Sequence, residues 1–221
     1  MIAGHARRIG VPRSLTLASP LYWSPWVYRL VMRALYGRAY DERYQVVANL
    51  VPDGSHVVDL CCGCGYLYTA FLAQREIAYT GVDLLPAMTR VLRQRPVQLV
   101  HGGVLDLATL PTGDICLMLG SLYHFHPREA DVLCRMAASA PRALLLEPVK
   151  NLSQSASKTV RFLAGAATYI SGTRSSYRLD SARLDAVLAQ AGVRVHGDRG
   201  VLGGGYRLVE FSRPPAGYRA T

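Results

Sequence analysis

Short apolar runs alternate with helix-like stretches between residues 56 and 148, and this alternation limits the possible folds most strongly. The apolar runs are HVVDL, AYTGVDL, VQLVHG, DICLMLGSL and RALLLEPV. Segments such as YLYTAFLAQ and PREADVLCRMAASA lie between them and are interpreted as helices. Strands that are separated by helices form a parallel sheet with both faces covered. The sequence therefore predicts an α/β fold with a doubly wound sheet.

The final segments follow a different order. SARLDAVLAQAG predicts a helix that ends at Gly192, and VRVHGD and YRLVEFSR predict two further strands. Only RGVLGGG lies between these strands, which leaves no room for a helix, so we expect a hairpin. The last of the seven strands should therefore run antiparallel to the others.

The turn after the first predicted strand carries the clearest chemical signal. In VVDLCCGCG, Asp59 precedes Gly63 and Gly65, and three cysteines lie among them. Glycine permits positive φ and leaves room for a ligand against the main chain, and a following helix offers free N–H groups. The alternative is a sulfur site for a metal or for redox chemistry. A structural zinc site needs four ligands, and Cys116 and Cys134 stand apart, so we expect no metal.

An acidic residue narrows the class of ligand. Asp83 follows Gly63 by 20 positions and ends the second predicted strand, where a carboxylate can accept both hydroxyls of a ribose. The dinucleotide fingerprint would have its third glycine at position 68, where this chain has Tyr68. A carboxylate at Asp59 would repel a pyrophosphate but attract an ammonium group.

These motifs resemble those of the class I S-adenosylmethionine (SAM)-dependent methyltransferases of the small-molecule type. DLCCGCG resembles the first motif, GVDLLPAM the second, GDICLMLGSLYHF the fourth strand with its loop, and LLLEPV the fifth strand. The resemblance extends from about residue 41 to residue 212. It implies a Rossmann-like sheet of seven strands, SAM as the cofactor, and an enzyme that methylates a small-molecule acceptor in specialised or lipid-related metabolism.

The resemblance also assigns cofactor-binding roles by position. The turn would hold the methionine end of SAM, Asp83 the ribose and Leu84 the adenine. The family's acid after the third strand is missing, because Gly103 stands in its place; either Asp106 replaces it or the main chain nearby contacts adenine. The expected cofactor-binding residues are Asp59, Cys61, Cys62, Gly63, Gly65, Asp83, Leu84, Val104, Leu105, Gly120 and Ser121.

Candidate catalytic residues lie beyond the fourth and fifth strands, at the edge where doubly wound sheets bind ligands. His124 in SLYHFHP is a candidate general base, because its ordinary pKa is close to neutrality. The alternative is that His124 packs or positions the substrate. Tyr123 would pack beside SAM or bond the substrate. Glu147 would orient a substrate amine or hydroxyl, or would only complete a hydrogen-bonded strand end.

Two segments outside the alternating pattern are expected to shape the acceptor site. Residues 1–40 are an aromatic and basic helical extension before the methyltransferase domain at 41–221, and residues 151–181 are a lid-like insertion. Tryptophan, tyrosine and arginine on an amphipathic helix also suit a membrane surface, so peripheral membrane contact is the alternative to an N-terminal lid. The expected substrate-binding residues are Tyr22, Trp26, Tyr36 and Tyr40.

Composition bears on partners and location. The formal charge of +10 motivates an RNA methyltransferase as an alternative, but the basic residues are scattered, and we expect no nucleic-acid partner. A non-catalytic SAM-fold binding or scaffold protein is the second alternative. Five cysteines without regular spacing, and no apolar run of about 20 residues, predict a reduced, cytoplasmic protein.

Overall fold

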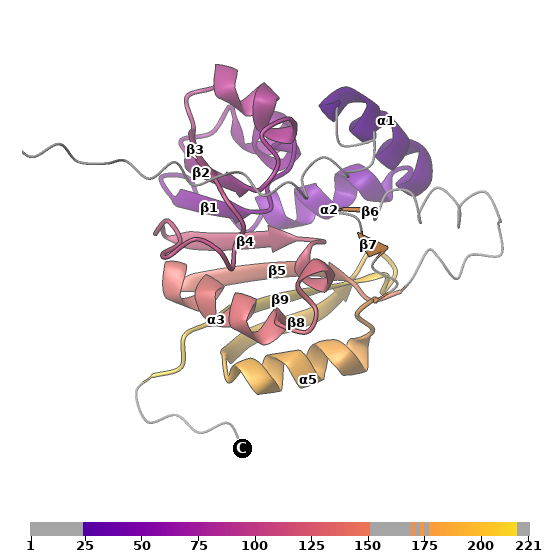
Figure 1. Cartoon of the computed structure of the whole chain (residues 1–221), viewed down its shortest axis with the longest axis vertical. Coiled ribbons are helices and arrows are strands. Elements are labelled where there is room, and N and C mark those ends of the chain that lie inside the picture. The colour runs from indigo at the N-terminus through magenta and orange to yellow at the C-terminus, as the bar shows by residue number, and fades with distance from the viewer. Residues whose placement is uncertain (1–23, 151–168, 171–172, 175–176, 216–221) are drawn as a thin grey trace, which may run out of the picture.

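The computed structural model describes residues 24–150, 169–170, 173–174 and 177–215, and these residues build a seven-stranded sheet (Figure 1). The strand order is β3-β2-β1-β4-β5-β9-β8. A separate two-stranded ribbon pairs β6 (Tyr169–Ile170) with β7 (Thr173–Arg174). The strands of the main sheet are β1 (His56–Leu60), β2 (Ala78–Asp83), β3 (Gln98–His101), β4 (Ile115–Leu119), β5 (Arg142–Pro148), β8 (Arg194–Val201) and β9 (Tyr206–Ser212).

The direction of the strands confirms the predicted topology. Strands β1 to β5 pair in parallel, whereas β9 is antiparallel to both β5 and β8. β8 and β9 form the expected hairpin, and the turn between them contains Gly203 and Gly204 at positive φ. β1 lies between β2 and β4, so the strand order reverses between β1 and β4. Ligands of doubly wound sheets bind at this kind of switch point, beyond the carboxyl ends of the strands.

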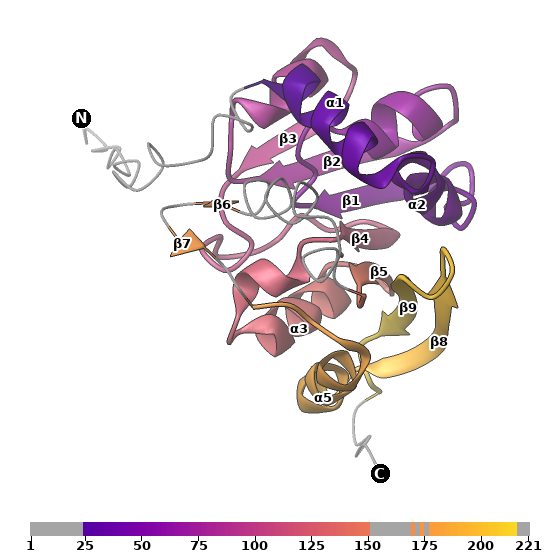
Figure 2. The same ribbon diagram turned by 90° about the vertical axis from the view of Figure 1, so that its right-hand side faces the viewer.

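Helices cover both faces of the sheet (Figures 1 and 2). One face packs against α2 (Ala39–Ala48), η3 (Tyr68–Leu72) and η4 (Met88–Gln94). The other face packs against η5 (Leu122–Phe125), α3 (Glu129–Ser139) and α5 (Ser181–Ala191). Successive residues of a strand point to opposite faces, so Leu117 enters the first layer and Met118 the second. Both faces are therefore buried, which explains why the strands read as continuous apolar runs.

The helices after β1 and β2 differ from the predicted ones. The segment expected as a regular helix contains the five-residue π-helix η3, and η4 is a 3-10 helix. The sequence of η3, YTAFL, has a β-branched and two aromatic residues, which have modest helix propensity. Thr69 also donates its hydroxyl to the Gly65 carbonyl, which competes with regular helix hydrogen bonding. The turn is therefore followed by a short, irregular helix.

Helix α1 (Pro25–Tyr36) lies outside α2 and η4 and leaves an apolar face uncovered. Ser24 caps its first turn and Gly37 ends it. Met32 is buried, whereas Trp26 and Leu30 are 76% and 60% exposed. Within the described ranges, every helix is too short or too polar to cross a bilayer. The predicted boundary at residue 40 and the lid at 151–181 stay predictions, because residues 1–23 and most of the insertion lie outside the described residues.

Candidate functional site

The turn after β1 contains three residues at positive φ, and its two glycines have different structural roles. Cys61, Gly63 and Gly65 have φ values of 57°, 55° and 63°. A side chain at Gly65 would place its Cβ 2.4 Å from Leu92, so the close packing of η4 requires glycine there. A Cβ at Gly63 would meet only Met88 Cε, at 3.9 Å. Gly63 therefore borders open space, whereas Gly65 serves packing.

Asp83 ties this turn to the end of β2. Its Oδ2 accepts the Gly63 N–H at 2.8 Å, and its Oδ1 accepts the Leu85 N–H at 2.8 Å. Burial raises the pKa of Asp83, and these main-chain hydrogen bonds act in the opposite direction. Leu84, directly after Asp83, is 38% exposed. A carboxylate and an open apolar side chain thus lie side by side at the carboxyl edge of the sheet.

Asp59 lies inside the protein. Its Oδ2 accepts the Tyr79 hydroxyl at 2.6 Å. Burial raises the pKa of Asp59 to about 7. The expected attraction of an ammonium group requires the ionised carboxylate, which dominates above that pH. Its role in the site stays a prediction.

The three cysteines of the turn are free thiols. Burial raises the pKa values of the Cys61 and Cys62 thiols well above the ordinary value of a thiol, and it raises the pKa of Cys64 to about 11. A metal ligand must be a thiolate, which this environment disfavours. The described residues also contain no group of three or more metal-ligating side chains. The environment of the thiols thus favours the main-chain interpretation of the turn.

The loop after β3 contains the position where the expected acid is missing. A Cβ at Gly103 would lie 2.2 Å from Asp106 Oδ2. The Asp106 carboxylate therefore occupies the space that a side chain at 103 would use. Val104 is buried and Leu105 packs partly against the core, so apolar contacts with the core fix the position of this loop.

Glu147 organises the loop after β4. The side chain is fully buried, and it accepts the N–H groups of Leu122 at 3.2 Å and Tyr123 at 3.4 Å. Burial raises its pKa to about 8. Gly120, at φ 63°, and Ser121 connect β4 to this loop. A fully buried Glu147 favours the strand-end interpretation over direct contact with a substrate.

His124 and Tyr123 lie together on this loop. Their ring centroids are 4.0 Å apart, and the Arg178 guanidinium lies 4.6 Å from the Tyr123 ring centroid. Burial, together with the positive charge of Arg178, lowers the pKa of His124 to about 4. The imidazole is therefore neutral at neutral pH and is a weak base. This environment favours packing or positioning over proton abstraction.

Of the expected substrate-binding residues that the structure describes, Tyr36 and Tyr40 lie in one aromatic cluster, whereas Trp26 is exposed. Tyr40 is fully buried and stacks on Tyr66 at 5.2 Å, and Tyr36 is half-buried nearby. Trp26 points to solvent, and Tyr22 lies outside the described residues. The sequence analysis missed Arg43, whose guanidinium lies 5.3 Å from the Tyr36 ring and 4.6 Å from the Tyr40 ring. Tyr40 and Arg43 are three residues apart on α2, and this spacing, which brings side chains together on a helix, could have indicated their contact.

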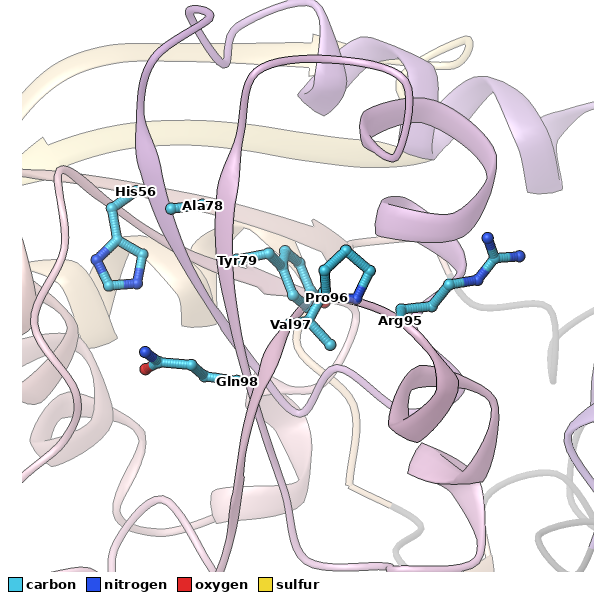
Figure 3. A pocket seen from close by; sticks show the side chains of 7 residues that line it. All are labelled: His56, Ala78, Tyr79, Arg95, Pro96, Val97 and Gln98. Atoms are coloured by element: carbon cyan, nitrogen blue, oxygen red, sulfur yellow. The ribbon is translucent and has the colours of Figure 1, made fainter.

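A hollow of about 460 Å³ lies at the opposite edge of the sheet, where β1, β2 and β3 begin (Figure 3). His56 Nε2 is 2.8 Å from the Thr80 hydroxyl, which donates to Gln98 at 3.3 Å. Figure 3 shows His56 and Gln98 on one side, with Arg95 extending away from them. Because the polar side chains bond one another and face the amino ends of the strands, this hollow is separate from the candidate site.

Comparisons with known proteins agree with this geometry. Residues 57–142 match a family model described as a methyltransferase domain. The mitomycin 7-O-methyltransferase is similar with a TM-score of 0.59 and 21% identity, over 86% of this chain and 61% of that one. A TehB-like SAM-dependent methyltransferase from Corynebacterium glutamicum has a TM-score of 0.60 and 15% identity, over 88% of this chain and 100% of that one.

An O-methyltransferase from neocarzinostatin biosynthesis, solved with SAM and 2-hydroxy-5-methyl naphthoic acid, gives a TM-score of 0.61 and 21% identity, over 88% of this chain. The present chain spans only 60% of that protein and 61% of the mitomycin enzyme. A comparison with curated proteins found no match. The strand order and the glycine turn agree with these matches: residues 57–142 match a methyltransferase domain, the described part of the chain has the fold of solved SAM-dependent methyltransferases, and SAM is the cofactor that such a domain implies.

Proposed function

We propose that the chain is a SAM-dependent methyltransferase that transfers a methyl group to a small-molecule acceptor. The observation that carries this proposal is the bond between the Gly63 N–H and the Asp83 carboxylate, at the switch point of the sheet. It places a glycine turn with open space next to a carboxylate and the exposed Leu84. These groups suit the methionine end, the ribose and the adenine of SAM, respectively, so the residues present fit the cofactor.

SAM supplies an electrophilic methyl group on a sulfonium when it is bound. The contribution of the chain is then mainly alignment, which can supply about 7–11 kcal/mol of the barrier. Gly63, Asp83 and Leu84 would hold the nucleoside, and Glu147 would fix the loop that carries Tyr123 and His124. We assign these two side chains to positioning the acceptor, because the lowered pKa of His124 leaves it a weak base.

We infer a hydroxylated natural-product type of acceptor from the similar structures, because one is described as a mitomycin 7-O-methyltransferase and another as an O-methyltransferase from neocarzinostatin biosynthesis. The open Gly120 side of the candidate site supports an acceptor beyond the carboxyl ends of β4 and β5, because a Cβ there would meet only Pro148 Cδ at 3.9 Å. The cytoplasmic location expected from the sequence is part of the same proposal.

Isothermal titration calorimetry with S-adenosylhomocysteine tests the function. Wild-type protein should bind this product nucleoside. Asp83→Asn should weaken binding by about 10-fold or more, because the carboxylate that accepts hydrogen bonds from the main chain and from the ribose hydroxyls is replaced by an amide. Glu76→Gln, an exposed acid near the opposite edge, is the matched control and should not change the affinity. Absence of binding by the wild type at millimolar ligand would instead support the scaffold alternative. Steeply salt-dependent binding to tRNA would favour the RNA alternative.

The uncovered face of α1 supports peripheral contact with an amphiphilic acceptor or a membrane. Trp26, Val27 and Leu30 are all exposed, and Arg29 adds positive charge nearby, whereas the charge of Arg33 is paired with Asp41 at 2.8 Å. Co-sedimentation with vesicles that contain anionic lipid should fall severalfold in the double variant Trp26→Ser, Leu30→Ser. Equal sedimentation of the double variant and the wild type would remove the membrane role and leave the lid interpretation.

A further inference from the structure

Arg43 is a buried cation without a carboxylate partner. It lies on α2 and is 8% exposed. All 15 aspartate and glutamate residues of the sequence fall within the described ranges. None of them forms an ion pair with Arg43. Burying an unpaired charge costs free energy of folding. We therefore expect an anion from a bound molecule to balance the charge of Arg43.

The surroundings of Arg43 are aromatic and partly unsatisfied. The guanidinium carbon lies 5.3, 4.6 and 4.8 Å from the ring centroids of Tyr36, Tyr40 and Tyr44. Nη2 donates to the Tyr44 hydroxyl at 3.2 Å. Nε is fully buried and has no hydrogen-bond partner, and the same is true of the Tyr206 hydroxyl. Contacts with aromatic faces offset part of the cost of burial but leave these donors unused.

The cluster adjoins the candidate cofactor turn on one side. Tyr40 packs in one apolar cluster with Cys64 and Met88, and Met88 Cε is the atom nearest to the open side of Gly63. On the other side, Tyr206 is the register partner of Pro148 at the end of β5, and it lies close enough to act electrostatically on Arg43. The cation therefore lies at the same edge of the sheet as the turn.

A further contact connects the cluster with the acceptor loop. Arg178 acts electrostatically on Tyr36, which borders the Arg43 guanidinium, and also on His124. Its guanidinium lies over the Tyr123 ring. Arg178 is thus close enough to act on Tyr36, which borders the buried cation, and on the side chains that we assign to positioning the acceptor.

We propose that Arg43 and the hydroxyl of Tyr206 form a binding site for one carboxylate of a small molecule in the methyl-transfer site. A carboxylate can accept hydrogen bonds from the free Nε–H and the tyrosine hydroxyl together, and its single negative charge balances one guanidinium. A phosphate dianion would carry an excess of negative charge into the same apolar surroundings. The inference rests on the proposed function for the source of the carboxylate, which is either the acceptor or the amino-acid end of the cofactor.

Two matched pairs of ligands distinguish these sources by calorimetry on the full chain. S-adenosylhomocysteine carries a carboxylate that 5′-methylthioadenosine lacks. Likewise, 2-hydroxybenzoate carries one that 2-hydroxybenzyl alcohol lacks, and this pair is titrated with S-adenosylhomocysteine present in saturating amount. Arg43→Met should weaken binding of the carboxylate member of one pair by about 10- to 100-fold and leave its neutral counterpart unchanged. Loss in the first pair identifies the cofactor, and loss in the second identifies the acceptor.

The variants are chosen so that misfolding does not obscure the result. Methionine is an unbranched, flexible and apolar side chain that suits aromatic surroundings, and replacing a buried charge with an apolar group is often tolerated. Arg43→Lys keeps the charge and should retain part of the carboxylate preference. Arg38→Met, at an exposed arginine one turn earlier, is the control and should behave as wild type.

A thermal-shift titration with sodium acetate against sodium chloride tests the site without any nucleoside. Acetate should raise the melting temperature of the wild type more than chloride does, and this difference should vanish in Arg43→Met. If the wild type binds neither nucleoside, the proposed function fails, and the acetate result still decides the site. Identical responses of wild type and Arg43→Met to every carboxylate probe would overturn the inference.

Discussion

At the scale of single residues, the Asp106 carboxylate lies where the side chain of residue 103 would lie if that residue were not glycine. The Asp106 N–H also donates to the Gly103 carbonyl, which closes a tight turn between the two. A carboxylate that starts three residues later can thus reach the same volume. Geometry therefore favours Asp106 over the main chain alone as the group that contacts the amino group of adenine.

Asp106→Ala should weaken the binding of S-adenosylhomocysteine by about 10-fold, because one hydrogen bond between a charged acceptor and the ligand is lost. Placing the acid at the alternative position, in the double variant Gly103→Asp, Asp106→Ala, should recover most of this loss. Calorimetry measures both. An unchanged affinity in the single variant would return adenine recognition to the main chain of residues 104 and 105.

At the scale of elements, η5 depends on a side chain from β5. A four-residue 3-10 helix has too few internal hydrogen bonds to be stable alone. Glu147 supplies acceptors for the N–H groups of Leu122 and Tyr123, so the end of β5 fixes the start of this helix. Tyr123 and His124 are then positioned through Glu147 and Arg178, not by the helix itself.

The raised pKa of Glu147 makes stability depend on pH in a defined direction. Its pKa is about 8 in the folded chain and near 4.5 in the unfolded chain, so between these values only the unfolded state loses the proton. The wild type should therefore lose stability relative to Glu147→Gln as the pH rises from 5 to 8. Urea unfolding at several pH values measures this difference.

Asp59, whose pKa is also raised, titrates in both proteins and cancels in the comparison. In Glu147→Gln, the side-chain NH₂ faces one of the two main-chain N–H groups, and two donors cannot bond each other. This lowers the stability of the variant by an amount that does not vary with pH. The informative quantity is therefore the slope of the difference against pH. A flat difference across this range would show that Glu147 is ionised in the folded protein.

At the scale of the whole molecule, the sequence predicted what depends on periodicity and missed what depends on contacts between distant segments. The seven strands and the antiparallel hairpin followed from apolar runs and a short connection. The irregular η3 did not, because its apolar pattern resembles that of a regular helix, and the hydrogen bond from the Thr69 hydroxyl to the Gly65 carbonyl does not show in a periodicity. The cluster around Arg43 was likewise hidden, because Tyr206 comes from the last strand and Arg43 from α2.

Arg142 provides one such long-range connection and the last prediction. Its Nε and Nη2 donate to the Glu210 carboxylate on β9 at 2.7 and 3.1 Å, and its Nη1 donates to the Leu50 carbonyl, after α2, at 2.6 Å. Arg142→Ala should therefore lower the free energy of unfolding by about 2 kcal/mol, the range of partly buried, charge-assisted hydrogen bonds. Urea denaturation measures it, and the exposed Arg90→Ala should change stability by less than about 0.5 kcal/mol. If both variants lost equally little, the hydrogen bonds of Arg142 to Glu210 and to the Leu50 carbonyl would contribute nothing measurable to stability.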